Sequence, residues 1–353
     1  MSADAQLWDG EEAVVAAARA GDQSAFAVLS ERYRRELGLH CYRMLGSYQD
    51  SEDLVQETFL RAWRGRETFT YQGPSSFRAW LFRVATNACI DVLRSKPRTP
   101  FPWQPESVDH RTSGSLSSPD RDLSWLQPYP DRLLERIASA DEQPESQVIA
   151  RETIELTFIV AIQLLPPVQR AVLILRDVLG WSAKETAALL GTTAVSVNSS
   201  LQRARATLRR QLPARRLDWA APAEPTAAER VVFRRYMDAH DRRDFTAMAE
   251  LLREDARLTM PPTPSWFEGR EAITALFASW LDPESAAYVG EVRRIEIGAN
   301  RQLACAGYLR RPGDSEYRPL GLEVLRIEDG QLAESTMFVS PELFPAFGLP
   351  STL

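Results

Sequence analysis

The sequence predicts a multidomain protein in which two all-α units are followed by a unit of mixed α and β structure. Apolar residues recur every three or four positions from about residue 22 to 94 and again from 148 to 210, the spacing of amphipathic helices. Residues 97–130 between these stretches contain seven prolines, so an extended linker is expected there. After residue 226 short alternating and apolar runs predict strands. A chain of 353 residues is long enough for two or three domains.

The composition is that of an ordinary globular protein, with 44% hydrophobic and 25% charged residues. We find no run of about 18 apolar residues that would predict a membrane span. The first residues are acidic and do not resemble a secretory signal, so a cytoplasmic protein is expected. The net charge of −6 does not exclude DNA binding, because attraction to phosphate depends on where the charges lie.

The cysteines and histidines give no sign of a metal site or of a nucleophile with its base. Their spacing fits neither zinc ligands nor a disulfide framework, and we expect reduced, buried cysteines. The residues concerned are Cys41, Cys89, Cys305, His40, His110 and His240. No metal, cofactor or catalytic residue is therefore predicted.

The first helical unit is expected over residues 8–96. Its helices are predicted at about 22–45, 50–63 and 75–94, and the second begins with acidic residues that suit the positive end of a helix dipole. The second helical unit is expected over residues 148–216. Its first helix ends at Pro166 and its second before Gly180, after which Ser182 and Glu185 form a capping box. Gly191 ends this short helix, and Thr193 caps the last one.

The segment 182–210 is predicted to be a helix-turn-helix that places its second helix in the major groove of DNA. No acidic residue occurs between Ala194 and Leu217, whereas six arginines do. A plain helical hairpin with a solvated arginine face is the alternative. The residues expected to contact DNA are Ser196, Asn198, Ser199, Gln202, Arg203 and Arg205.

Residues 182–208 resemble region four of the extracytoplasmic-function sigma factors of bacterial RNA polymerase, although Asn198 and Ser200 stand where many relatives have arginine. Residues 50–63 are similar to the region-two motif that docks on the β′ subunit in this family. The resemblance implies that an apolar anchor with a polar rim contacts core polymerase. The residues expected there are Asp53, Gln56, Glu57, Phe59, Leu60 and Trp63.

Residues 77–94 resemble the helix that recognises and opens the downstream promoter element in these factors. Opening requires unstacked bases and a single strand to be held by aromatic, amide and arginine side chains. We expect these roles for Phe69, Tyr71, Arg78, Arg83, Asn87 and Arg94, whereas Trp80, Leu81 and Val84 are expected in the core.

The third unit is expected over residues 227–353, after a short linker at 217–226. Helices at about 227–239 and 270–281 and strands near 257–260, 288–297, 302–310 and 320–327 predict an antiparallel sheet with helices on one face. Asp329-Gly330 predicts a tight hairpin. The runs at 235–245, 260–262 and 266–273 resemble the SnoaL-like branch of the nuclear-transport-factor-2-like fold, which implies a pocket that could bind a small molecule. His240 is expected to be structural, because the fold alone does not confer catalysis.

The linker at 97–147 contains aromatic residues that suggest docking on a surface, with local self-packing as the alternative. The contact residues would be Trp125, Leu126, Pro128 and Tyr129. Some sigma factors of this family carry a SnoaL-like domain after region four, and the resemblance implies regulation in cis.

The sequence thus predicts a sigma factor, monomeric when free, that binds the β and β′ subunits of core polymerase and promoter DNA. A ligand-sensing regulator that does not join polymerase, and an enzyme that uses the C-terminal pocket, are the alternatives.

Overall fold

A computed structural model describes residues 10–73, 76–95, 126–138, 154–211, 225–263 and 266–353. The chain divides into two compact units, a helical unit of residues 1–98 and 136–219 and a mixed unit of residues 99–135 and 220–353. The predicted combination of helical domains with a C-terminal α+β domain is confirmed.

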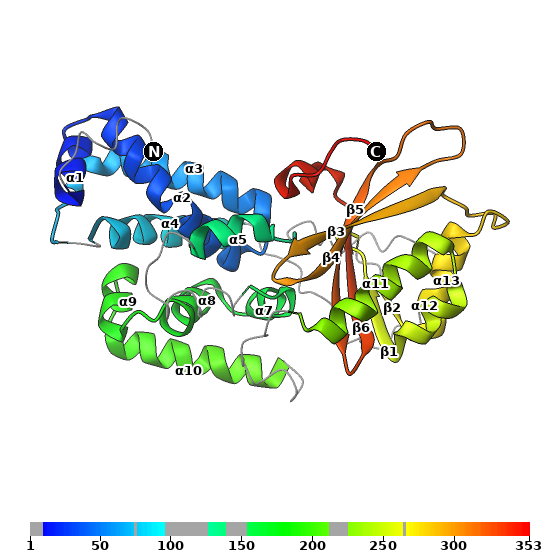
Figure 1. Ribbon diagram of the computed structural model, residues 1–353. Helices are drawn as coiled ribbons and strands as arrows, with labels where there is room; N and C mark the ends of the chain where they lie inside the picture. Colours follow the sequence, from blue (N-terminus) through cyan, green and yellow to red (C-terminus); the bar gives the residue numbers. More distant parts are fainter. Residues whose placement is uncertain (1–9, 74–75, 96–125, 139–153, 212–224, 264–265) are drawn as a thin grey trace. The chain divides into compact units, whose positions relative to one another are not determined.

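The helical unit begins with α1 (Glu11–Arg19), which the sequence analysis did not predict, and continues with α2 (Gln23–Leu45), α3 (Tyr48–Gly65), η2 (Arg66–Thr68) and α4 (Ser76–Ser95). Asp22 caps α2 by accepting hydrogen bonds from two backbone amides, and Ser47 caps α3 by accepting one from the Asp50 amide. Gly46 separates these helices in the left-handed conformation. Helices α2, α3 and α4 pack against one another and bury the predicted apolar stripes (Figure 1).

The second part of this unit contains α7 (Leu156–Ile162), α8 (Pro167–Leu173), η3 (Ile174–Val178), α9 (Ala183–Leu190) and α10 (Ala194–Gln211). The capping box of Ser182 and Glu185 and the left-handed Gly191 are as predicted. The helix predicted over 168–179 widens to a π-type turn at Ile174. The predicted helix start near residue 148 lies outside the described residues.

After residue 225 the described part of the mixed unit contains the α-helices α11 (Ala227–Arg242), α12 (Phe245–Leu251) and α13 (Arg270–Leu281). Its strands are β1 (Leu252–Thr259), β2 (Trp266–Glu268), β3 (Glu291–Ala299), β4 (Gln302–Arg310), β5 (Arg318–Glu328) and β6 (Gln331–Phe338). They form one sheet in the order β2-β1-β6-β5-β4-β3. Asp329 and Gly330 have positive φ in the β5–β6 turn, as their hairpin requires.

The sheet is mixed, so the prediction of an antiparallel sheet is wrong in one respect. The last strand, β6, lies between β5 and β1 and pairs parallel with β1. Strand periodicity does not encode the direction of a partner that is distant in sequence, and the long connection from β1 to β6 permits either direction.

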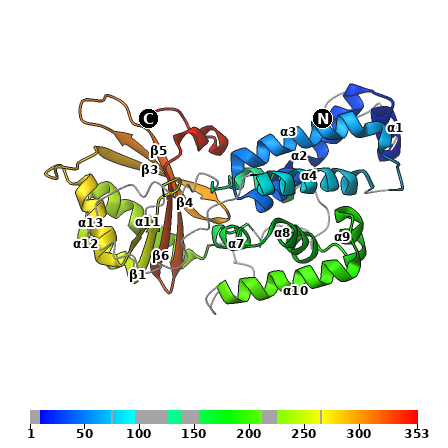
Figure 2. The same ribbon diagram turned by 180° about the vertical axis from the view of Figure 1, so that it is seen from behind.

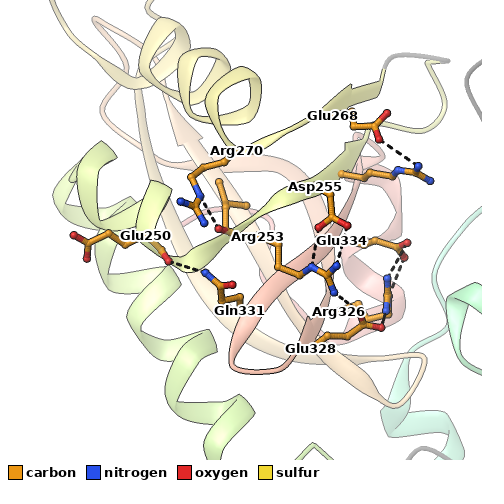
Figure 3. Close-up of polar contacts among 11 residues, drawn as sticks. Glu250, Arg253, Asp255, Glu268, Arg270, Arg326, Glu328, Gln331 and Glu334 are labelled. Atoms are coloured by element: carbon orange, nitrogen blue, oxygen red, sulfur yellow. Dashed lines mark hydrogen bonds and ion pairs between the residues drawn. The ribbon is translucent and has the colours of Figure 1, made fainter. Parts of the chain in front are cut away.

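The three helices cover one face of the sheet (Figures 1 and 2). The core between them is apolar and includes Phe233, Phe277, Leu303 and Leu325. Near β1 and β6 the sheet carries crossed ion pairs, in which Arg253 contacts Asp255 and Glu328, while Arg326 contacts Glu328 and Glu334 (Figure 3). The tail helix η5 (Pro341–Phe347) packs against β5. Its Phe344 ring also lies 5.0 Å from that of Tyr308 in the neighbouring strand β4.

The three cysteines are free and buried, as predicted. The region predicted to be a linker contains a regular element that was not predicted, the helix α5 (Asp131–Ala138). Asp131, in its first turn, has the negative charge that suits a helix N-terminus.

Candidate functional sites

The helices α9 and α10 form the predicted helix-turn-helix. Val197, Leu201, Ala204 and Leu208 are buried on the inner side of α10. The Thr193 hydroxyl accepts a hydrogen bond from the Ser196 amide at 3.2 Å and fixes the first turn. Among the predicted DNA contacts the structure leaves Ser196, Asn198, Gln202, Arg203 and Arg205 exposed and Ser199 half-buried.

Two of the predicted DNA-binding arginines are also engaged within the unit. Arg205 donates two hydrogen bonds to the Asp177 carboxylate, at 2.9 and 2.7 Å, and these bonds raise the pKa of its guanidinium. Arg203 donates to the Ser200 hydroxyl at 3.2 Å. Arg205 therefore links α10 to η3. Arg209 and Arg210 lie in the last turn of α10, a helix that contains no Asp or Glu.

The predicted polymerase contacts on α3 divide into an outer and an inner group. Asp53 and Gln56 are exposed, and Leu60 is the apolar residue of this face with 51% of its surface exposed. Phe59 is buried, and Trp63 packs edge-on against Phe26 at 5.1 Å between ring centroids. Glu57 is half-buried and pairs with Arg61, so Leu60 is the exposed apolar side chain among the predicted contacts.

The residues predicted to hold melted DNA also lie in different surroundings. Arg83, Asn87 and Arg94 are exposed on α4, and Tyr71 is half-buried. Phe69 is buried, with its ring 5.5 Å from that of Phe77 and 5.1 Å from that of Trp80. In this structure the Phe69 side chain is part of the core and is not open to an extruded base.

Arg78, another predicted DNA contact, lies between the two segments of the helical unit. It donates paired hydrogen bonds to the Glu36 carboxylate and stacks over Phe82, with its guanidinium carbon 4.8 Å from the ring centroid. The Trp181 ring lies 5.6 Å from that of Phe82 and 5.7 Å from the Arg78 guanidinium. Arg78 therefore contributes to the contact between α4 and the loop before α9.

Arg170 makes a second contact between these segments, which sequence reasoning did not find. The side chain is buried in α8 and donates to the carbonyl oxygens of Met44 at 2.5 Å, Gln163 at 2.9 Å and Leu165 at 3.1 Å. The Gln163 amide in turn donates to the Arg43 carbonyl at 3.3 Å. The signal in the sequence is an arginine directly before the apolar run AlaValLeuIleLeu at 171–175.

The His40 side chain gives this interior a dependence on pH. Burial, followed by the charges of Arg43 and Arg78, lowers the pKa of His40 from 6.5 to about 3. The unfolded chain therefore binds a proton between about pH 6.5 and 3 that the folded chain does not, and the free energy of unfolding falls as the pH is lowered.

We expect His40 to contribute a loss of about 1.4 kcal/mol for each pH unit below 6.5. His40→Gln keeps a polar group near the Thr86 hydroxyl, 2.9 Å from Nε2, but does not titrate. Denaturant unfolding between pH 7 and 5 should show a shallower decline for this variant. Equal slopes for the two proteins would contradict the assignment.

Residues 126–134 dock on the mixed unit. Leu126, Pro128 and Tyr129 of the predicted contact are buried there, whereas Trp125 lies outside the described residues. The Tyr129 amide donates to the Asn300 side-chain oxygen at 2.8 Å, and the Asn300 amide donates back to the Tyr129 carbonyl at 3.0 Å. Pro130 forms an isolated β-bridge with Ala299.

The β3–β4 turn binds residues 126–134 through its backbone amides. Asn300 and Arg301 both have positive φ. The Arg301 amide donates to the Asp131 carboxylate at 2.8 Å. Gly298 lies beneath Asp131, and a Cβ atom there would be 2.7 Å from the Asp131 Oδ2 atom. Arg132 also donates to the Ala346 carbonyl of the tail at 2.6 Å. Residues 126–134 therefore contact both the β3–β4 turn and the C-terminal tail of the mixed unit.

The interior of the mixed unit contains a polar cluster centred on Glu323. Its carboxylate accepts hydrogen bonds from Tyr236 and Ser335, both at 2.7 Å, and lies 3.7 Å from the Arg294 guanidinium. Burial raises the pKa of Tyr236 and lowers that of His240. His240 is held between the rings of Tyr236 and Phe277. Neither His240 nitrogen has a hydrogen-bond partner among the described residues, so nothing there orients it as a base.

Within the described ranges, no helix is both long and apolar enough to cross a membrane. The same ranges contain no group of three or more His, Cys, Asp or Glu side chains placed to hold a metal ion.

Three segments of the chain match known domain families. Residues 29–99 match Sigma-70 region 2, residues 156–208 match Sigma-70 region 4, and residues 233–335 match the SnoaL-like domain. The chain is 41% identical over 336 residues to the ECF RNA polymerase sigma factor SigG of Mycobacterium tuberculosis, covering 95% of this chain and 86% of that protein. It is 30% identical to SigW of Bacillus subtilis over 54% of this chain and 91% of SigW.

The fold also resembles a solved structure. The crystal structure of the M. tuberculosis extracytoplasmic function sigma factor SigJ aligns with a TM-score of 0.54 and 20% identity, over 92% of this chain and 99% of that one. The likeness extends through the helical domains and the C-terminal domain.

Proposed function

Because this chain belongs to the extracytoplasmic-function sigma factors of RNA polymerase, we propose that it binds core polymerase through α3 and reads an upstream promoter element through α10. The observation that carries the proposal is the capped helix-turn-helix, whose second helix is anchored by four buried apolar residues and presents polar and arginine side chains outward. The exposed residues of α4 act on the downstream element in this proposal.

The proposal is tested by transcription in vitro from core polymerase and the purified chain. Promoter-dependent transcripts are expected only when both are present. A chain that binds promoter DNA but does not join polymerase would instead be a ligand-sensing regulator. Co-purification of the chain with core polymerase would exclude this alternative.

Leu60→Glu is expected to weaken binding to core polymerase by at least about tenfold, because it places a charge in the apolar centre of the docking face. The matched control is Val231→Glu in α11, where the side chain has 50% of its surface exposed and lies in the other unit. Titration of labelled core polymerase with each variant measures both affinities. Equal affinities of the two variants would remove Leu60 from the interface.

We further propose that the mixed unit regulates the sigma domains in cis through residues 126–134. The support is the reciprocal pair of hydrogen bonds between Tyr129 and Asn300, with Asp131 seated over Gly298. Because this segment connects the two halves of the helical unit in the chain, its docking restricts the separation that region two and region four can adopt. A change in docking then shifts the population able to engage polymerase.

In this proposal the mixed unit acts without catalysis. Glu323 is already occupied by hydroxyl donors of the same unit, and His240 has no orienting partner among the described residues. A small-molecule ligand in the pocket expected between the sheet and the helices of the mixed unit stays a prediction. An assay that detected turnover of a metabolite by the wild-type chain, lost in Glu323→Gln, would favour the enzyme alternative.

A further inference from the structure

Val195 is an apolar side chain that the fold leaves in solvent. With 76% of its surface exposed, it is more exposed than any other large hydrophobic residue that the structure describes. It is the second residue of α10, in the turn that Thr193 caps. Nothing in the packing of the helical unit requires a valine at this position.

The position of Val195 on α10 aligns it with the polar residues proposed to read DNA. Ser199 and Gln202 lie four and seven residues further on, so the three side chains share one stripe of the helix. The buried stripe, which begins at Val197, faces the opposite way. Val195 therefore lies at the N-terminal end of the outward face, where a recognition helix meets base edges.

The chemistry of a valine limits what it can recognise in the major groove. Each base pair presents hydrogen-bonding groups there, and the one apolar group is the 5-methyl of thymine. A β-branched side chain in a helix has essentially one χ1 rotamer, so the two methyl groups of Val195 are held in a fixed direction before DNA binds. No acidic residue occurs in the first turn of α10 to repel a phosphate.

We propose that Val195 contacts the 5-methyl group of a thymine in the upstream promoter element and selects thymine at that position. The inference rests on the proposed role of α10 in promoter reading. It adds a determinant of sequence to the polar contacts, since Ser199 and Gln202 beside it can donate and accept hydrogen bonds but cannot recognise a methyl group.

The test uses holoenzyme assembled from core polymerase and the full chain. Promoters are first selected from a pool with a randomised upstream element, and each thymine of the selected element is then replaced by deoxyuridine, which removes only the methyl group. At one position this replacement should weaken binding of the wild-type holoenzyme about fourfold, the effect of one buried methyl group of about 0.8 kcal/mol.

Holoenzyme with Val195→Ala should bind the thymine promoter about fourfold more weakly than the wild-type holoenzyme does. Its affinity should not fall further when that thymine is replaced by deoxyuridine. Val231→Ala, an exposed valine of α11, should keep the full wild-type response. The proposal is overturned if Val195→Ala retains the deoxyuridine penalty, or if no thymine of the selected element gives one. Failure of wild-type holoenzyme to select any element would instead refute the proposed promoter-reading function itself.

Discussion

Replacing Arg170 with methionine is expected to lower the free energy of unfolding of the helical unit by about 3–5 kcal/mol. The guanidinium is buried and supplies hydrogen bonds to carbonyl oxygens of Met44, Gln163 and Leu165, which belong to two segments of the chain. Methionine has a similar length but no donor, so these carbonyl oxygens would stay buried without their partner.

Hydrogen exchange of the amides in α2 and α8 measures this effect within the helical unit alone. The control is Arg209→Met, since Arg209 is an exposed arginine of α10 and its loss should change the free energy by less than about 0.5 kcal/mol. Protection factors for Arg170→Met that match those of the control would show that the buried arginine is not a structural link.

Gly298→Ala should release residues 126–134 from the mixed unit. The added Cβ atom would lie 2.7 Å from Oδ2 and 2.9 Å from Cβ of Asp131, closer than such atoms approach. Displacing Asp131 breaks its bond to the Arg301 amide and disturbs the adjoining pair between Tyr129 and Asn300. Three hydrogen bonds of about 1 kcal/mol each correspond to roughly a hundredfold faster exchange of the amides of Tyr129 and Asn300.

Transcription with core polymerase then reports whether docking controls activity, and we expect Gly298→Ala to change it at least threefold. Gly307→Ala in β4 is the matched control, because its added Cβ would meet neighbours only at 3.7–3.9 Å, an ordinary contact. If released and docked chains transcribe equally, residues 126–134 have no part in regulation, although the sigma function would stand.

The local elements of this fold could be predicted because their signals are local. The capping box of Ser182 and Glu185 and the Asp329-Gly330 turn each depend on a few neighbouring residues, and the structure confirms both. The parallel pairing of β6 with β1 joins strands that are about 80 residues apart in the chain, so no local pattern specifies it.

The candidate sites were predictable as helices but not as individual contacts. Both Phe59 and Leu60 belong to the motif at 50–63 that predicts the polymerase contact. Only the packing of α3 shows that Phe59 is buried and Leu60 is exposed. The resemblance of residues 77–94 to a promoter-opening helix predicts Arg78 as a DNA contact. Its partner Glu36 lies 42 residues away, so no local motif indicates the ion pair between them. The docking of Tyr129 was indicated by its unusual setting in a proline-rich segment, whereas its partner Asn300 was not.

The distance in sequence between Tyr129 and Asn300 has a consequence for the newly made chain. The two residues are 171 positions apart, and β6, which fills the sheet between β1 and β5, follows still later. At a synthesis rate of about 5–20 residues per second, roughly 10–30 s pass between the synthesis of Tyr129 and that of the β3–β4 turn that contains Asn300. During that interval the nascent sigma domains carry an undocked connecting segment, so any restraint from the mixed unit begins only after they have been translated.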